Sequence, residues 1–263
     1  VVCDHVPNLL SICCCIYLLK SERKRLGEVN KVKNEITWIT AHSGADGTCE
    51  NSMEFVYYVL TTSADILELD VRRDKDHNLV IAHDETDGGA VSLRSVFTVM
   101  RKHTEMRMNC DLKEYGLELP VLRLAEECGL SPEQILYSGS VRPLRMAEPC
   151  SWREVEVYWN VEECIPDICG DIGPYHPKDI STESTAEKLV AACRDCGIST
   201  VNICEKFLNE SFLSVMKKNG IGISAWTVNE PVRIRQLLGM GIRNITTRNL
   251  KEALMLRREG KAL

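Results

Sequence analysis

The sequence lacks an excess of positive charge. Its 263 residues include 32 lysines and arginines against 38 aspartates and glutamates, which gives a formal net charge of −6. A general nucleic-acid surface needs clustered basic side chains, so no nucleic-acid partner is expected. An acidic chain that handles a phosphate needs local help, from a metal ion or from a few well-placed cations. The apolar fraction of 44% and the charged fraction of 27% are those of an ordinary globular protein.

Long hydrophobic runs are also missing. The most apolar stretch, Leu9–Leu19, is too short to span a bilayer, which takes about 20 residues. It has no basic leader, and the chain opens with Val rather than Met, as expected if the natural start lies upstream. We expect an N-terminal helix here in preference to a signal or an anchor, and lipidation of Cys13–Cys15 is a weaker alternative. Membrane contact is not expected, and the role of residues 1–30 stays open.

The cysteines do not form the pattern of a disulfide framework. Thirteen is an odd number and the spacings are scattered, which favours a reducing compartment and predicts a cytoplasmic protein. Cys193 and Cys196 have CxxC spacing, but no second pair stands at zinc-site distance and the stretch has a helical pattern. Cys110 and Cys204 fall on expected strands, where a buried thiol is the ordinary interpretation.

No linker rich in Pro or Ser divides the chain, so residues 31–263 are expected to form one domain. From about Ile36, short strand-like runs alternate with helical ones, as in α/β proteins. The expected strands are Thr37–Ala41, Ile66–Val71, Met106–Leu112, Ile135–Ser138, Val155–Asn160, Thr200–Cys204, Gly222–Val228 and Arg243–Thr246. Helical stretches between them include Ser52–Thr61, Leu93–Lys102, Glu118–Cys128, Ala186–Cys196 and Pro231–Gly239. Eight strands predict a (β/α)8 TIM barrel.

The expected strands alternate polar and apolar residues, whereas parallel strands usually read as continuous apolar runs. The alternating polar residues are Glu68, Asp70 and Arg72; Arg107, Asn109, Asp111 and Lys113; and Glu154, Glu156, Tyr158 and Asn160. We expect the apolar set to pack on the helices and the polar set to face the barrel axis. An antiparallel sandwich would alternate in the same way, but the intervening helices argue against it. Because a polar lumen is costly unless it is used or fully hydrogen-bonded, a charged substrate or a metal inside the mouth is favoured.

A hairpin extension is predicted after the second strand. Glu68-Leu69-Asp70-Val71 is followed, after a short charged turn, by Val80-Ile81-Ala82-His83-Asp84. The connection is too short for a parallel crossover, so Leu79–His83 must fold back as a hairpin arm. A turn near Asp76 then places His83 or Asp84 roughly opposite Glu68. Two carboxylates on one strand face and an imidazole indicate a metal-assisted acid–base site, and polar residues on a solvated hairpin are the plainer alternative.

Other polar residues stand at strand ends, where this fold places catalytic groups. His42 ends the first strand, and Asp111 and Lys113 share a face at the end of the third. A lone histidine at a loop start is more often structural, so His42 gains its weight from His83 and the carboxylates. Weaker candidates are Ser138, Asn160, Asn202 and Glu205, and then Tyr175 and His176 in the irregular stretch Glu162–Ser184, which we expect to form a loop over the barrel mouth.

Several motifs occur in an order that resembles the glycerophosphodiester phosphodiesterase family, a group of TIM-barrel enzymes similar to phospholipase C. They are His42-Ser43-Gly44, Glu50-Asn51, Glu68-Leu69-Asp70-Val71, Lys75-Asp76, His83-Asp84, Asp111-Leu112-Lys113 and Trp226-Thr227-Val228-Asn229. The resemblance runs from about residue 38 to about residue 250. The block from Glu68 to Asp84 is its most specific part.

The resemblance implies a role for most of these residues. Glu68, Asp70 and Asp111 would hold one divalent cation, Mg²⁺ or Ca²⁺, through oxygen ligands. His42 and His83 would be the acid–base pair, since an imidazole has a pKa near neutrality. The resemblance also implies two substrate contacts: Lys113 to a phosphate oxygen and Trp226 as an apolar wall, with a tryptophan that merely fills the barrel as the plainer alternative. Asn160 is a candidate substrate contact because of its place at a strand end. The implied partner is a small-molecule phosphodiester.

The chain departs from the family pattern at four places. Ser43 stands where an arginine is usual, which removes a bidentate phosphate contact, and Arg72 is a candidate substitute because it shares a face with Asp70. Asp111 stands where a glutamate is usual and is shorter by one methylene. The segment after His83 is compact, which predicts an open mouth. Thr246-Thr247-Arg248 has an arginine where an acidic residue is common.

The implied reaction is metal-dependent hydrolysis of a glycerophosphodiester to glycerol phosphate and an alcohol. Two alternatives remain at this stage. One is an enzyme related to phospholipase D or phosphatidylinositol-cleaving phospholipases that stops at a cyclic phosphate. The other is a non-catalytic barrel that binds phosphate or metal, in which Ser43 marks lost activity. Head group, metal and oligomeric state are left open by the pattern.

Overall fold

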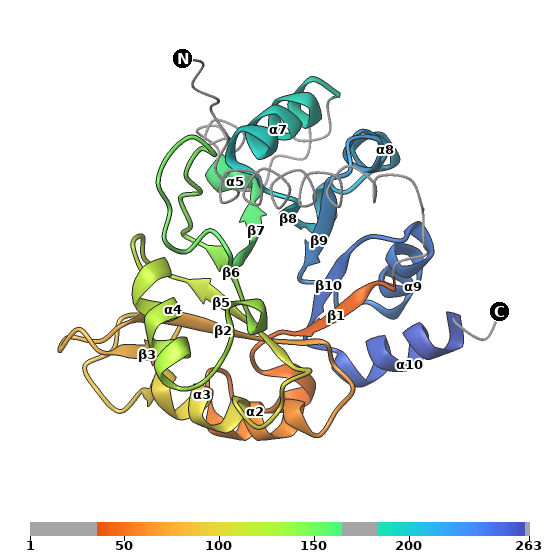
Figure 1. The fold of residues 1–263 in the computed structure, drawn as a ribbon. Helices are drawn as coiled ribbons and strands as arrows, with labels where there is room; N and C mark the ends of the chain where they lie inside the picture. The colour runs from red at the N-terminus through yellow and green to blue at the C-terminus, as the bar shows by residue number, and fades with distance from the viewer. Residues whose placement is uncertain (1–35, 165–182, 261–263) are drawn as a thin grey trace, which may run out of the picture. The chain divides into compact units, whose positions relative to one another are not determined.

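A closed parallel barrel forms the centre of the fold in the computed structural model, which describes residues 36–164 and 183–260. Its strands are β1 (Trp38–Ala41), β2 (Ile66–Arg73), β5 (Arg107–Leu112), β6 (Ile135–Gly139), β7 (Glu156–Asn160), β8 (Thr200–Cys204), β9 (Gly222–Trp226) and β10 (Asn244–Thr247). They neighbour one another in the order β1, β10, β9, β8, β7, β6, β5, β2, and pairing of β2 with β1 closes the barrel. Figure 1 shows the red β1 beside the blue β10. The predicted TIM barrel and its eight strands are confirmed.

Helices surround these strands (Figure 1). They are α2 (Met53–Leu60), α3 (Leu93–Met100), α4 (Glu118–Glu127), α5 (Val161–Cys164), α7 (Glu183–Cys196), α8 (Glu210–Lys218), α9 (Pro231–Met240) and α10 (Leu250–Gly260), with single 3-10 turns at Ala45–Gly47, Pro132–Gln134 and Glu205–Phe207. The prediction of an irregular stretch over Glu162–Ser184 is wrong at both ends, because α5 and α7 extend into this range. Its remainder, with Tyr175 and His176, lies outside the described residues, as does the expected N-terminal helix.

Local sequence signals fix where several helices begin. The Ser52 hydroxyl accepts a hydrogen bond from the Phe55 amide and caps α2, and Asn209 caps α8 through Phe212 in the same way. Pro231 occupies the first turn of α9, where its missing amide hydrogen costs nothing. These caps set the lengths of the connections to the preceding strands.

The hairpin after β2 is present and contains one strand more than predicted. β3 (Leu79–Ile81) pairs antiparallel with the end of β2, with Val71 opposite Ile81, and β4 (Val91–Ser92) pairs with β3. The Ala82 amide donates to the carbonyl of Asp70, so the chain that leaves β3 returns to the rim of the barrel. His83 is the next residue, and the hairpin therefore carries it to the end of β2 where the acidic side chains lie.

Apolar side chains on the outer face of the strands pack against the helices, as the alternation predicts. Leu67, Leu69 and Val71 on β2 are fully buried in the same apolar cluster as Phe55 of α2 and Phe97 of α3. Inside the barrel, the first layer is formed by Trp38 with a small separate group of buried residues, Ile66, Leu136 and Tyr158. Above that layer the lumen is polar.

Within the described part of the chain, every helix is too short or too polar to cross a bilayer. Residues 36–164 and 183–260 belong to one compact unit. The domain boundary expected at residue 31 lies outside the described residues and stays a prediction.

Candidate active site

A cavity of about 340 Å³ opens at the carboxyl ends of the barrel strands. Its lining comes from all eight barrel strands or the residues that directly follow them, and from His83 of the hairpin: His42, Glu68, Asp70, His83, Asn109, Asp111, Lys113, Ser138, Asn160, Asn202, Trp226, Thr227, Thr246 and Arg248. This is the end of the barrel where the fold places its functional groups. Among the predicted site residues that the structure describes, which leaves out Tyr175 and His176, all but Arg72 and Glu205 line this cavity.

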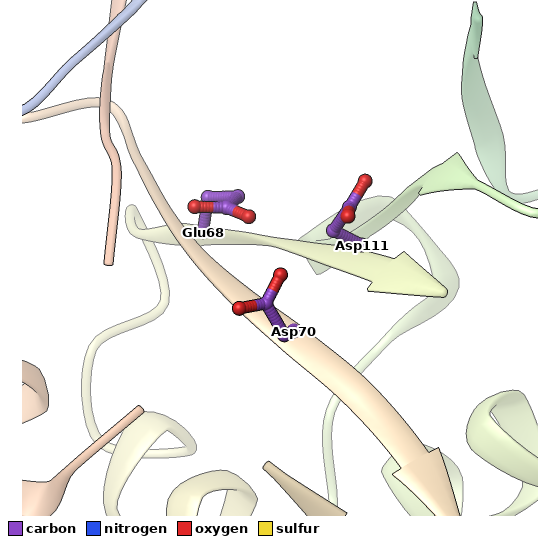
Figure 2. A group of neighbouring side chains, drawn as sticks. All are labelled: Glu68, Asp70 and Asp111. Carbon is purple, nitrogen blue, oxygen red and sulfur yellow. The ribbon is translucent and has the colours of Figure 1, made fainter. Parts of the chain in front are cut away.

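Three carboxylates meet on one side of this cavity. Glu68 and Asp70 come from β2 and Asp111 from the neighbouring β5, where Asp70 and Asp111 stand opposite each other in register. Figure 2 shows the three side chains around a common space. One carboxylate oxygen from each lies within 4.8 Å of the other two. Within the described residues, this is the set of histidines, cysteines and acids that could hold a metal ion.

The carboxylates are held by hydrogen bonds from neighbouring elements. The Asn51 side chain donates to Asp70 Oδ2 over 2.8 Å and accepts from the Asp70 amide over 3.1 Å, so it fixes both ends of that residue. The Ser43 amide donates to Glu68 Oε2 over 3.1 Å, and the Ser138 hydroxyl donates to Asp111 Oδ1 over 2.5 Å. These contacts come from the loop after β1 and from β6, and they orient the oxygens before any ligand arrives.

Lys113 is the internal counterion of the cluster. Its ammonium nitrogen lies 2.7 Å from Asp70 Oδ1 and 2.6 Å from Asp111 Oδ2. Burial by itself would lower the pKa of Lys113, but the charges of Asp111 and Asp70 raise that pKa above its usual value. Burial would likewise raise the pKa of Asp70, but Lys113 and Asn51 outweigh that penalty and hold the pKa below its usual range.

Glu68 lacks such a counterion. Its side chain is buried, and burial, together with the charges of Asp70 and Asp111, raises its pKa to about 7, although His42 partly offsets this. Three carboxylates with one ammonium leave an excess of negative charge at this end of the lumen. An all-oxygen donor set with this charge fits a hard divalent cation. Glu68, Asp70 and Asp111 are thus the residues that would hold it.

His42 stands beside the acidic cluster with one ring nitrogen engaged. Its Nδ1 lies 3.1 Å from the Ser43 carbonyl and 3.5 Å from Glu68 Oε2. Both neighbours accept hydrogen bonds, so the tautomer assigned by this geometry carries its proton on Nδ1. Nε2 is then the nitrogen that can exchange a proton with a bound molecule.

His83 has a similar arrangement and is more exposed. Its Nδ1 lies 2.9 Å from Asp84 Oδ1, and its side chain is 63% exposed against 21% for His42. The Arg72 guanidinium donates to the His83 carbonyl over 3.0 Å. Arg72 itself does not line the cavity, and Glu114 and Glu85 lie 4.0 Å from its side chain. Its placement suits holding the His83 backbone and gives no support to the expected phosphate contact.

Amide side chains line the far wall of the cavity. Asn202 donates to Asn160 Oδ1 over 2.8 Å, and Asn109 donates to the Ser138 hydroxyl over 2.9 Å. The Oδ1 atoms of Asn202 and Asn109 and the indole nitrogen of Trp226 are buried with no hydrogen-bond partner. Such groups are costly to leave unsatisfied, which suits a wall that binds a polar molecule.

Sequence reasoning assigned no site role to Arg248, nor to Asn109, Thr227 and Thr246, which also line the cavity. Arg248 follows β10, and its side chain contacts the Ser43 carbonyl and Glu50. The signal was present in the sequence, because Arg248 is two residues after Thr246 and therefore shares its face. Glu205, by contrast, pairs with Arg233 over 3.0 Å and lies away from the cavity.

The fold and the site together define an α/β barrel with an oxygen-rich, histidine-flanked pocket at its carboxyl rim. No family model matches the chain. A curated relative in Bacillus subtilis (strain 168), YhdW, which carries a provisional name as a glycerophosphodiester phosphodiesterase, is 26% identical over 239 residues, covering 80% of this chain and 93% of the relative.

Solved structures with the same barrel carry names of that family. A provisionally named glycerophosphoryl diester phosphodiesterase of Agrobacterium tumefaciens matches 87% of this chain and 100% of its own with a TM-score of 0.68 and 14% identity. A phosphodiesterase of Oleispira antarctica, solved with the product sn-glycerol-3-phosphate, matches 84% and 96% with a TM-score of 0.59 and 18% identity. The predicted resemblance to the glycerophosphodiester phosphodiesterases is therefore confirmed.

Proposed function

We propose that the protein is a metal-dependent phosphodiesterase that hydrolyses glycerophosphodiesters to glycerol phosphate and an alcohol. The observation that supports this most directly is the convergence of two histidines, three carboxylates and a lysine on one cavity at the carboxyl end of the barrel. A cavity of about 340 Å³ suits a small polar molecule. The name of the curated relative and the product bound in the Oleispira antarctica structure support the same substrate class.

His42 and His83 are proposed as the acid–base pair. Each has Nδ1 engaged by an acceptor, which leaves Nε2 of each ring to act on the substrate. One imidazole takes a proton from the attacking oxygen, which belongs to water or to the neighbouring glycerol hydroxyl. The other gives a proton to the departing alkoxide. Because the two rings approach the cavity from the ends of β1 and of the hairpin, they can flank a phosphorus atom placed between them.

Glu68, Asp70 and Asp111 are proposed to hold one Mg²⁺ or Ca²⁺ ion. When bound, the ion would stabilise negative charge on the phosphoryl oxygens. Lys113 presents a second positive charge at the same wall, and the indole of Trp226 offers an apolar surface to the glycerol or the leaving group. The three carboxylates would hold the ion, and Asn51 and Ser138 orient two of them, Asp70 and Asp111.

The test is turnover of several glycerophosphodiesters with Mg²⁺, Ca²⁺, Mn²⁺ or a chelator. His42→Ala and His83→Ala should each lower kcat by about 10² to 10⁴ while leaving the circular dichroism spectrum unchanged. His103→Ala is the matched control, because His103 is exposed and lies outside the cavity. Full turnover in both active-site variants would refute the proposal.

Phosphorus NMR of the product distinguishes the remaining reactions. Release of glycerol phosphate supports hydrolysis, whereas accumulation of a cyclic phosphate shows that the reaction stops after attack by the glycerol hydroxyl. Measurable ligand binding with no turnover under any metal would identify a binding protein instead.

A further inference from the structure

The backbone of Arg248 is fixed against the loop after β1. Its amide donates to Asn229 Oδ1 over 2.9 Å, and its carbonyl accepts from the Asp46 amide over 2.8 Å. Asn229 follows β9 and Asp46 belongs to the 3-10 turn that follows β1, so these two bonds tie the end of β10 to the connections after both of its neighbouring strands. The side chain thus starts from a defined position at the rim of the cavity.

The guanidinium of Arg248 is only lightly held. Nε donates to the Ser43 carbonyl over 3.1 Å, and Nη2 lies 2.8 Å from Glu50 Oε1. The side chain is 43% exposed and that of Glu50 is 54% exposed. An ion pair between two side chains this exposed is weak, because water screens both charges, so a ligand phosphate can replace the carboxylate at little cost.

Arg248 also has donors to spare, in contrast to Lys113. Among the described residues that line the cavity, these two carry permanent positive charge. Lys113 is placed between two carboxylates at 2.6 and 2.7 Å. A guanidinium has five N–H donors in a planar fork that matches two phosphate oxygens, and the two contacts described use only two of its nitrogens.

Glu50 is positioned to compete with a phosphate for the guanidinium of Arg248. Gly44, which has a φ of 82°, leaves room for it, because a Cβ on Gly44 would come within 2.7 Å of Glu50 Cγ. The carboxylate reaches Arg248 across this glycine and has no hydrogen-bonding tie to the acidic cluster among the described contacts. It is therefore a replaceable partner of the guanidinium.

We propose that Arg248 is the phosphate-binding cation of this site and that Glu50 occupies its guanidinium until a phosphate or phosphodiester displaces it. The inference rests on the proposed function for the nature of the ligand, but binding can be measured without turnover. The geometry gives the two residues opposite effects on affinity: Arg248 attracts the anion, and Glu50 competes with it.

The experiment compares Arg248→Gln and Glu50→Gln by calorimetric titration with sn-glycerol 3-phosphate at saturating Mg²⁺, and by kcat and KM for a glycerophosphodiester. Arg248→Gln should weaken binding at least about tenfold and raise KM, whereas Glu50→Gln should tighten binding about threefold. Arg235→Gln and Glu259→Gln are the matched controls, since they break an exposed Arg–Glu pair of 3.3 Å outside the cavity.

The signs of the two effects decide the outcome. If the pair only braces the loop after β1, both variants weaken binding alike, and the proposal is overturned. It is also overturned if Arg248→Gln leaves binding unchanged or if the unaltered protein binds no glycerol phosphate. Opposite effects on binding in a protein without turnover would support Arg248 as the phosphate ligand while refuting the proposed hydrolysis.

Discussion

The two ends of the barrel lumen are both charged, but they are balanced in different ways. At the amino end, Glu156 lies between Arg107 and Arg243, with one carboxylate oxygen 2.7 Å from the first and the other 2.9 Å from the second. Both guanidiniums lie over the ring of Trp38, at 5.0 and 5.1 Å from its centroid. At the carboxyl end, Glu68, Asp70 and Asp111 share a single ammonium.

This difference indicates that the amino-end cluster is structural and that the carboxyl-end cluster is suited to binding. The amino-end carboxylate has a cation for each of its oxygens, and Gly222 makes space for Arg243, because a Cβ there would lie 2.7 Å from Arg243 Cδ. The carboxyl-end cluster keeps an uncompensated acid, whose pKa is raised to about 7. A buried charge without a partner costs stability, so the second cluster is suited to receive a cation that the first cannot use.

The same substitution at the two ends should therefore have opposite effects. Glu68→Gln should lower kcat/KM by about 100-fold or more, because it removes a proposed ligand of the ion, and should leave the chelated protein at least as stable at pH 7.5. Glu156→Gln should lower the free energy of unfolding by about 2 kcal/mol, because two arginines lose their shared anion, with activity of the folded enzyme nearly unchanged.

Urea denaturation in chelator and steady-state assays at low temperature measure the two effects. Gln is close to Glu in size at both positions, so the pair of variants controls for packing. A loss of stability in Glu68→Gln equal to that in Glu156→Gln would show that both clusters are structural. The contrast between the two ends would then be wrong.

Sequence reasoning recovered the barrel because strand spacing and alternation are local properties. The same parity placed Asp70, Asp111 and Lys113 on one inner face, and the hairpin motif placed His83. The prediction that Arg72 contacts the phosphate failed, because Arg72 lies beyond the rim of the cavity. There the hairpin folds back, and the Arg72 guanidinium donates to the His83 carbonyl. Parity along β2 continues past the point at which the cavity ends.

Strand parity could have placed Arg248 at the cavity, but its partnership with the loop after β1 could not be inferred from the sequence, for a different reason. Ser43 and Arg248 are separate departures from the family pattern, and they are 205 positions apart. They meet only because β1 pairs with β10 when the barrel closes. A sequence read without the fold shows a missing arginine at one place and an extra one at another, with nothing that connects them.

The pH dependence of stability should report the raised pKa of Glu68 at the carboxyl end. The folded pKa of Glu68, about 7, lies above the value of about 4.3 expected for an unfolded glutamate. The folded state then binds the extra proton between these values, so stability falls as pH rises from about 4.5 to about 7, by at most about 3 kcal/mol. A bound cation should reverse this trend, because it replaces the proton, and its affinity should drop below about pH 7.

The free energy of unfolding of the chelated protein at pH 5.5 and pH 7.5 shows whether stability falls as pH rises. Glu68→Gln is the reference, because subtracting its pH dependence removes the contribution of the other titrating groups. Isothermal titration with Mg²⁺ at the same two values checks the competition. Equal pH dependence in the two proteins would mean that Glu68 is ionised in the folded state without assistance from a cation.

The smallest expected contrast concerns the two tryptophans of the lumen. Trp38 lies beneath two guanidiniums and packs with Ile66, Leu136 and Tyr158 at the amino end, whereas Trp226 lines the cavity at the carboxyl end. Trp38→Phe should cost about 1 kcal/mol of unfolding free energy, since phenylalanine is smaller and a weaker partner for cations, and should leave KM unchanged. Trp226→Phe should change stability by less and raise KM, because the cavity loses part of its apolar wall.

Thermal unfolding and steady-state kinetics on the same preparations measure both. A change in KM in Trp38→Phe that matches the change in Trp226→Phe would show that the two ends of the lumen are coupled.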